Sequence, residues 1–235
     1  MDFQFSDDQN AVRDLARGIL EKEVTVERLK RLEREDSAHD RALWATLAEV
    51  GLLGLAIPAE HDGMALGLQE VCIFLLELGR VAAPGPFLPT LLGSLAIALD
   101  GTEAQKRDWL VPVAGGDCVL ALALVDAESS DPLRPGTRAE RDGRGWVLTG
   151  TKHWVSAADL AGRILVPARA GDDILVFLVD PAAAGVTLAV HGTSTAETAF
   201  TVTLAGAHVA DADVLPGTDA ARHLYESTLV AHCAM

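Results

Sequence analysis

The chain has 235 residues, enough for one large domain or two modest ones of roughly 100–150 residues each. Apolar residues make up 49% of it, which excludes disorder as the dominant state, and the formal charge of -15 disfavours nucleic acid as a partner. The longest uninterrupted apolar run, residues 119–125, is far shorter than the roughly 20 residues that span a bilayer. Because the N-terminus is acidic where a secretory signal would be basic, we expect a cytoplasmic protein.

The cysteines and histidines give no sign of a metal centre. Cys72, Cys118 and Cys233 are widely separated and have neither metal-ligand nor redox spacing, so we expect buried, reduced thiols. The seven histidines are also scattered, without the close pairs that are typical of zinc ligands. No metal site is predicted.

The first half of the chain is predicted to be helical. Ser6 and Gln9 have the spacing of a capping box, and apolar residues follow at three- and four-residue steps. The same period marks residues 40–50 and 68–78, and residues 86–99 are apolar on nearly all sides, as in a buried helix. Thr102 and Gln105 repeat the capping box and begin a helix that ends before residues 115–116, a pair of glycines.

The second half is predicted to be β-structure. Short β-branched runs separated by Gly, Asp and Pro cover residues 119–125, 134–141, 146–149, 164–169, 174–179, 186–190 and 199–204, with a hairpin turn at 142–145. Residues 219–235 return to a helical pattern. The predicted fold class is α+β: an N-terminal all-helical domain (1–116), a small β-barrel domain (117–217) and the start of a C-terminal helical domain (218–235). Without a low-complexity linker, the two main domains are expected to pack directly on each other.

The segment 150–156 (Gly-Thr-Lys-His-Trp-Val-Ser) is the strongest candidate for a functional site. Strand side chains alternate with period two, so an extended segment puts Trp154 and Ser156 on the same side. A flat apolar wall beside a hydrogen-bond donor suits a flavin ring, which offers an apolar face and a polar edge at N5. The alternative is an ordinary strand with one packed indole.

Four stretches in the same order resemble the acyl-CoA dehydrogenase family over the whole length of the chain. Residues 3–9 are similar to the family's opening before its first helix, and residues 51–60 are similar to its loop after the third helix. Residues 101–106 resemble its "GTxxQK" start of the helix that leads into the barrel. Residues 150–156 resemble "G-x-K-x-W-I-[ST]", the family's strongest short signature.

The resemblance implies an FAD site and an acyl-CoA substrate. In that family the tryptophan lies against the flavin ring and the hydroxyl two residues later donates toward N5, so Trp154 and Ser156 are expected to take these roles, with the backbone of Val155 at the flavin edge. A donor at N5 stabilises the electron density that arrives with the hydride. The resemblance also implies electron-transfer flavoprotein as the acceptor and a homo- or hetero-oligomer.

A second family signature, "[AV]-x-T-E-P-x-A-G-S-D", is poorly kept in residues 124–131. In the family its Thr bonds the flavin and its Gly-Ser amides receive the pyrophosphate. Here the segment is one residue shorter, Val125 replaces the Thr and can offer only its backbone, Asp126 replaces the Glu, and Ser129 replaces the Gly. The cofactor-binding residues that remain by resemblance are Leu124, Val125 and Ser130, and Ser130 is also the one substrate contact carried over.

The altered loop leaves two interpretations open. Asp126, Glu128 and Asp131 can be a solvated acidic turn, or they can line a flavin site in which Glu128 adds negative charge close to the phosphates. The loop after the third helix, "E-x-x-G-G" in the family, is also changed and reads Glu60-His61-Asp62-Gly63.

No catalytic residue is predicted in this chain. Family enzymes remove the α-proton with a Glu from a C-terminal helical bundle, and this sequence stops where that bundle begins. We expect either a fragment of a longer protein or a natural short form that works with a partner. The final helix ends without a capping Gly, which favours the fragment. Leu224, Leu229 and Val230 of that helix would then be left partly unburied.

Three functions therefore compete. The first is an FAD-dependent acyl-CoA dehydrogenase that desaturates an acyl thioester and passes electrons to electron-transfer flavoprotein. The second is a non-catalytic companion subunit of a hetero-oligomer, favoured by Val125, Ser129 and the shortened loop. The third is a binding domain unrelated to flavin.

Overall fold

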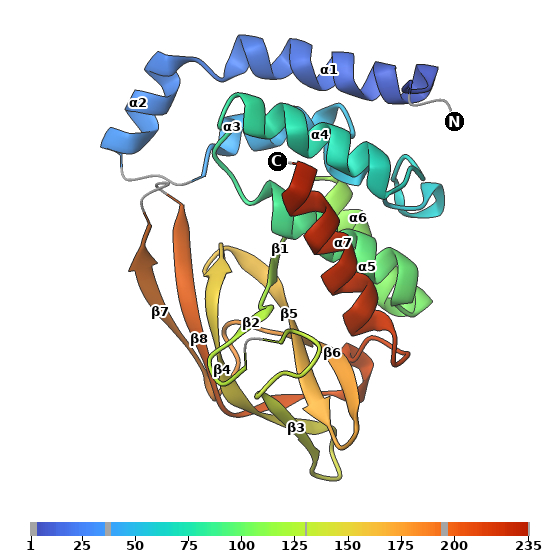
Figure 1. Cartoon of the computed structure of the whole chain (residues 1–235), viewed down its shortest axis with the longest axis vertical. Coiled ribbons are helices and arrows are strands. Elements are labelled where there is room, and N and C mark those ends of the chain that lie inside the picture. The colour runs from blue at the N-terminus through green and yellow to red at the C-terminus, as the bar shows by residue number, and fades with distance from the viewer. Residues whose placement is uncertain (1–3, 36–38, 130, 194–196, 235) are drawn as a thin grey trace.

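The computed structural model describes residues 4–35, 39–129, 131–193 and 197–234. Helices form one end of the molecule and strands the other, and the last helix runs alongside the others (Figure 1). The helices are α1 (Asp7–Glu23), α2 (Val26–Arg34), α3 (Arg41–Glu49), α4 (Leu68–Arg80), α5 (Phe87–Asp100), α6 (Glu103–Ala114) and α7 (Ala220–Ala234). Within the described ranges the predicted α+β class is confirmed.

The predicted helix starts are confirmed by their caps. Ser6 and Gln9 form a complete capping box at α1, and Thr102 and Gln105 form another at α6. One helix, α2, is absent from the sequence prediction. Its apolar residues Val26, Leu29 and Leu32 recur at three-residue steps, but the helix is short and otherwise mostly charged, and of the three only Leu32 is buried.

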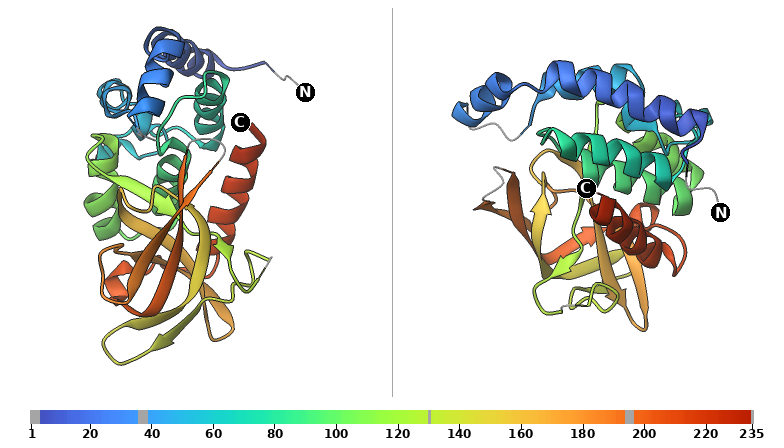
Figure 2. Two further views of the ribbon diagram at one scale, coloured as in Figure 1. Left: turned by 90° about the vertical axis from the view of Figure 1, so that its left-hand side faces the viewer. Right: turned by 45° about the horizontal axis from the view of Figure 1, so that its top comes forward.

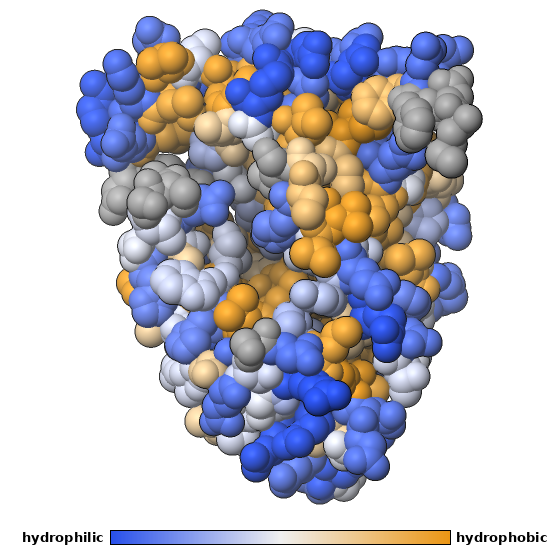
Figure 3. All heavy atoms as spheres, in the orientation of Figure 1, coloured by the Kyte–Doolittle hydropathy of each residue, from blue (hydrophilic) through white to orange (hydrophobic). Residues whose placement is uncertain are grey.

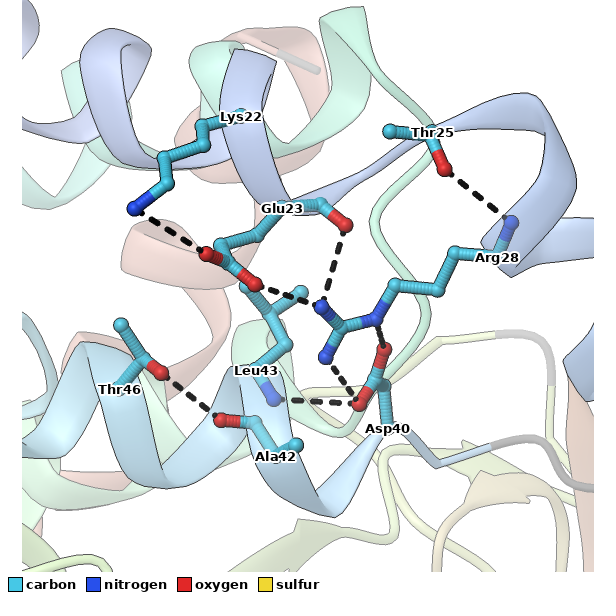
Figure 4. A network of polar contacts seen from close by, with 8 residues as sticks. All are labelled: Lys22, Glu23, Thr25, Arg28, Asp40, Ala42, Leu43 and Thr46. Atoms are coloured by element: carbon cyan, nitrogen blue, oxygen red, sulfur yellow. Dashed lines mark hydrogen bonds and ion pairs between the residues drawn. The ribbon is translucent and has the colours of Figure 1, made fainter.

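A polar network holds α2 against α1 and α3 (Figure 4). Arg28 of α2 forms two hydrogen bonds with the carboxylate of Asp40, one of them Nη2 to Oδ1 at 2.8 Å, and a third with Glu23 Oε2 at 2.7 Å. Asp40 is also the N-cap of α3 and accepts from the Leu43 amide. Burial favours a higher pKa for Asp40, but these hydrogen bonds outweigh it and lower the pKa. Charge pairing therefore adds to the small apolar contact that α2 makes through Leu32.

Eight strands form one sheet in the order β1-β5-β3-β4-β8-β7, with β2 on β4 and β6 on β5. The strands are β1 (Val119–Leu122), β2 (Val125–Asp126), β3 (Arg138–Arg141), β4 (Trp146–Ser156), β5 (Ala161–Ala170), β6 (Asp173–Val179), β7 (Val186–Gly192) and β8 (Thr198–Val209). The hairpin turn at 142–145 is confirmed, since Arg141 pairs with Trp146. The prediction of one strand at 119–125 is wrong: β1 pairs with β5, whereas β2 crosses to β4.

Two cores stabilise the molecule, and one of them crosses between the halves. The second core lies within the sheet, around residues such as Val155, Phe177 and Val202. The first joins the helices to Leu120, Leu165 and other side chains on β1, β5 and β6. The expected direct packing of the two halves is therefore confirmed, and two views show the helices lying across one end of the sheet (Figure 2).

Polar contacts add to this direct packing. The Leu120 amide of β1 donates to Thr90 Oγ1 of α5 at 3.2 Å, and Gln105 Nε2 of α6 donates to the carbonyls of Ala212 and Val214 at 2.7 and 2.9 Å. Gln105 is buried, so these bonds lie inside the contact between the halves.

The final helix, α7, packs on α4 and α5 with one face and leaves another bare. Leu224 is buried, so the expectation that it stays partly exposed is wrong, whereas Leu229 and Val230 are 53% and 51% exposed, as predicted. Apolar colouring marks the surface over α7 and the hollow beside it (Figure 3). A groove follows the same helix; its lining residues are Leu68, Leu99, Asp100, His223, Glu226, Ser227 and Val230.

The cysteines differ from expectation in their burial. All three are free thiols, but Cys72 and Cys118 are only half-buried and Cys233 is exposed. Burial raises the pKa of the Cys72 and Cys118 thiols. Among the described residues, no group of three or more His, Cys, Asp and Glu could hold a metal ion, and no helix is long and apolar enough to cross a membrane.

Candidate functional site

The candidate site is built on an irregular stretch of β4. The pairing of β4 with β8 shifts between Lys152 and Val155, and Trp154 between them has φ 57°, in the left-handed region. The expectation of a regular extended strand is therefore wrong at Trp154. Val155 is fully buried and pairs with Phe200, while the indole of Trp154 is 62% exposed. The irregularity sends the indole outward, and the alternative of a packed core indole is wrong.

A histidine ring lies beside the outward indole and belongs to a small polar network. The ring of His191 on β7 lies 5.8 Å from that of Trp154, centroid to centroid. Thr201 Oγ1 on β8 lies 2.8 Å from His153 Nδ1 and 2.6 Å from His191 Nε2. A hydroxyl has one proton to donate and two lone pairs that accept, so at least one of the two rings donates to Thr201. This network ties β7 and β8 to the β4 bulge.

Ser156 offers the hydroxyl that the sequence predicts. It is half-buried beside Val155, and within the part of the chain that the structure describes its Oγ makes no hydrogen bond. An apolar wall and an uncommitted donor two residues away fit the face and edge of a flavin ring. The ring-binding end of the predicted site is therefore compatible with the residues present.

The first stretch of the altered loop lies beside this site. Val125 on β2 pairs with His153, one residue before the indole, and is 48% exposed. Leu124 is partly buried against the first core. The third predicted residue of this loop, Ser130, lies outside the described residues, so its cofactor and substrate roles stay predictions.

A buried ion pair, which sequence analysis did not predict, lies behind the bulge. Lys152 Nζ lies 2.9 Å from Asp126 Oδ2, and the two side chains are 0% and 1% exposed. Thr137 donates to the same oxygen from both its amide (3.0 Å) and its hydroxyl (2.8 Å). Burial favours a higher pKa for Asp126, but Thr137 and Lys152 prevail and lower the pKa to about 2. Burial is also the main reason why the pKa of Lys152 is lowered.

This pair corrects one interpretation of the loop. A solvated acidic turn is wrong for Asp126, although Glu128 and Asp131 are exposed as that interpretation predicts. Asp126, where the family pattern has Glu, keeps a carboxylate in place for Lys152. The sequence signal was present as a lysine in the signature and an acid in the loop, but nothing in the sequence states that two such distant residues meet.

The phosphate-binding end fits less well than the ring end. Amides of residues 128, 131, 133 and 134 already donate to oxygens of the loop itself: Asp126 Oδ1, Ser129 Oγ, Asp131 Oδ1 and the Asp131 carbonyl. An anion-binding nest needs such amides free. The exposed carboxylates of Glu128 and Asp131 add negative charge. In this conformation the amides at these four positions are not free to receive a pyrophosphate.

The two halves of the chain define a helical domain joined to a sheet domain that carries an outward tryptophan. The family models that match are "Acyl-CoA dehydrogenase, N-terminal domain" over residues 6–117 and "Acyl-CoA dehydrogenase, middle domain" over residues 125–203. The chain belongs to the acyl-CoA dehydrogenase family.

Known proteins similar to this chain extend well beyond it. "Acyl-CoA dehydrogenase FadE27" of Mycobacterium tuberculosis is 30% identical over 222 residues, which are 94% of this chain but 58% of that protein. The chain thus spans little more than half the length of this relative.

Solved structures share the fold. A variant of the Tcur3481-Tcur3483 steroid ACAD superposes with a TM-score of 0.91 at 36% identity, covering 97% of this chain and 62% of that chain. The ChsE4-ChsE5 complex from Mycobacterium tuberculosis gives 0.92 at 29% identity, with 100% and 64% covered. An acyl-CoA dehydrogenase complexed with FAD from Bacillus anthracis gives 0.81 at 26% identity, with 97% and 41% covered.

Proposed function

We propose that this chain forms the N-terminal and middle domains of an FAD-dependent acyl-CoA dehydrogenase, which desaturates an acyl-CoA thioester between its α and β carbons and passes electrons to electron-transfer flavoprotein. The observation that carries the proposal is the outward Trp154 with the uncommitted hydroxyl of Ser156 beside Val155. A bound flavin supplies the hydride acceptor. The indole offers its ring an apolar wall, and Ser156 Oγ offers a hydrogen bond to its polar edge.

The catalytic base and the pyrophosphate contacts are assigned to no residue of this chain. Four described loop amides, at residues 128, 131, 133 and 134, are already bonded, and α7 has an uncovered apolar face. We therefore assign the base and much of the phosphate binding to protein beyond these 235 residues, either in a longer chain or in a partner subunit. Acyl-chain specificity rests on the same missing contacts.

The flavin site is tested by titrating the purified protein with FAD and following flavin absorbance and fluorescence. We expect binding with quenched fluorescence, because an indole stacked on the ring quenches it. Trp154→Ala should weaken FAD binding about fivefold or more, since base–aromatic and similar stacking contacts contribute about 1–3 kcal/mol. Trp146→Phe is the matched control: Trp146 lies on the same strand but packs against Phe177 and Arg141. A wild-type protein that takes up no FAD contradicts the flavin site in this chain.

The second candidate function is that of a companion subunit. It is favoured by the loop amides that already donate hydrogen bonds within the loop itself. In that case a flavin-bearing homologue of the same family completes the active site, and this chain supplies surface rather than cofactor contacts. Two of the similar solved structures carry paired names, ChsE4-ChsE5 and Tcur3481-Tcur3483, which supports a two-component assembly.

Co-expression separates the two candidates. This chain would be produced together with a full-length flavin-bearing homologue of the same family, and the purified complex analysed for subunit ratio and flavin content. The companion role predicts a stable complex in which Trp154→Ala leaves the flavin content unchanged. The dehydrogenase role predicts that the same substitution lowers it.

A further inference from the structure

The ion pair between Asp126 and Lys152 lies directly behind the residues of the candidate flavin site. Lys152 is the last residue of β4 in regular register with β8 before the shift, and Trp154 follows two positions later. Asp126 belongs to the two-residue strand β2, which pairs with β4 at Asp126–Lys152 and Val125–His153. The pair therefore joins two segments at the point where β4 changes register.

A contribution to folding stability alone does not explain this buried ion pair. Both side chains are buried, and within the described residues the Lys152 ammonium has one ion-pair partner, Asp126 Oδ2 at 2.9 Å, and no hydrogen bond of good geometry. Taking two charges out of water costs more than one such contact returns, and apolar side chains of the same volume are often as stable or more so. The best-attested benefit of a buried pair is the selection of one register or conformation over others.

The neighbours of the pair are arranged around the same point. Thr137 donates twice to Asp126, and Gly150 lies so close that a Cβ there would come within 2.7 Å of the Thr137 Cα. On the other side, Asp126 Oδ1 accepts from the Glu128 amide, near the start of the loop of residues 127–136. Residues 150 and 152 of the signature thus contact one buried cluster, whereas Trp154 is exposed and Ser156 is half-buried.

We propose that Asp126, Lys152 and Thr137 are positioning residues that fix the β4 bulge and so set the direction of Trp154 and Ser156 toward the flavin ring. Among the described residues, the Lys152 ammonium finds its opposite charge in this core only at Asp126. The ion pair therefore fixes the register of β4 at this position. Slipping β4 by one residue would bring Lys152 to the opposite face and leave Asp126 without its cation. The inference rests on the proposed flavin site, but its first readout does not need the cofactor.

The experiment uses protein labelled with 5-fluorotryptophan, whose four ¹⁹F signals are assigned by single Trp→Phe substitutions. The test variant is the double substitution Asp126→Asn with Lys152→Met, which removes both charges and leaves no ion unpaired. We expect it to keep a cooperative thermal transition but to shift or split the Trp154 signal, and to weaken FAD binding at least fivefold. Thr137→Val, which removes one hydrogen bond only, should give a smaller change in the same direction.

Asp126→Glu is the rescue variant, because it keeps the charge and restores the acid of the family pattern. It should retain a single Trp154 signal and FAD binding within twofold of wild type. The signal of Trp109, which stacks on Arg163 away from the bulge, should be the same in every variant.

The outcomes separate the two proposals. A Trp154 signal and an FAD affinity that match wild type in both the double variant and Thr137→Val overturn the positioning role and leave the pair a matter of stability alone. If wild type binds no FAD but its Trp154 signal moves in these variants, positioning is supported and the cofactor proposal fails. A signal that moves while FAD affinity stays constant shows that the pair fixes the bulge without serving the flavin, which also overturns the proposal.

Discussion

Single residues in this chain act through partners that lie far away in the sequence. Asp126 illustrates this, since its substitution for the family's Glu suggests a degraded loop until its contacts with Lys152 and Thr137 are seen. Gly150 is similar: the close approach of Thr137 explains why the signature begins with a residue that has no Cβ. Both residues support the buried cluster, and neither needs to touch a ligand.

The Asp126 carboxylate should make stability fall with acid. Its pKa is lowered from 3.8 to about 2 on folding, so its stabilisation is complete above about pH 4 and is lost as the pH falls toward 2. The shift corresponds to about 2 kcal/mol of unfolding free energy. Urea denaturation of wild type and Asp126→Asn between pH 5 and pH 2 measures it: the two curves should converge as the pH falls. Parallel curves across that window would contradict the assignment.

At the scale of elements, local sequence patterns predicted most of the helices and strands. Helix α2 and strand β2 were not predicted as they form. The capping boxes at α1 and α6 and the hairpin at 142–145 are short-range features that a sequence states directly. Helix α2 was missed because it depends on Arg28, whose partners Glu23 and Asp40 lie on either side of it in the chain. Strand β2 was joined to β1 because periodicity cannot tell which neighbour a strand will choose.

Removal of the Arg28 side chain should loosen α2. Arg28→Met leaves the buried Asp40 carboxylate without its cation, and we expect the unfolding free energy to fall by about 2–3 kcal/mol. Arg31→Met is the matched control on the same helix, because its contact with Glu35 is long and exposed, and it should cost less than about 0.5 kcal/mol. Urea denaturation gives both values. Equal costs would show that α2 is held by something other than this pair.

At the scale of the whole molecule, the two halves behave as one packed unit. The first core continues from the helices onto β1, β5 and β6, and α7 adds Ala220, Leu224 and Ala231 to it. Gln105 contributes a polar link, since it caps α6 with one end of its amide and donates to the sheet side with the other. Unfolding of the helices and the sheet is therefore expected to be coupled.

This coupling is tested at Gln105. Gln105→Glu keeps the acceptor for the Thr102 amide but aims a buried carboxylate at the carbonyls of Ala212 and Val214, so we expect a loss of about 3 kcal/mol. Gln9→Ala is the control, because Gln9 holds the same capping position at α1 without any contact to the sheet, and it should cost about 1 kcal/mol. A split thermal transition in Gln105→Glu would support the coupling; similar costs for the two variants would contradict it.

The sequence by itself determined the family, the order of elements and the residues of the signature, because caps, periodicity and ordered motifs are properties of short segments. It also marked Trp154 and Ser156 as a wall and a donor, although it assumed a regular strand. Only the tertiary structure decided that Trp154 is turned outward at a bulge, that Asp126 is paired rather than solvated, and that α2 exists. Each of these depends on contacts between segments, where burial and charge pairing outweigh local preference.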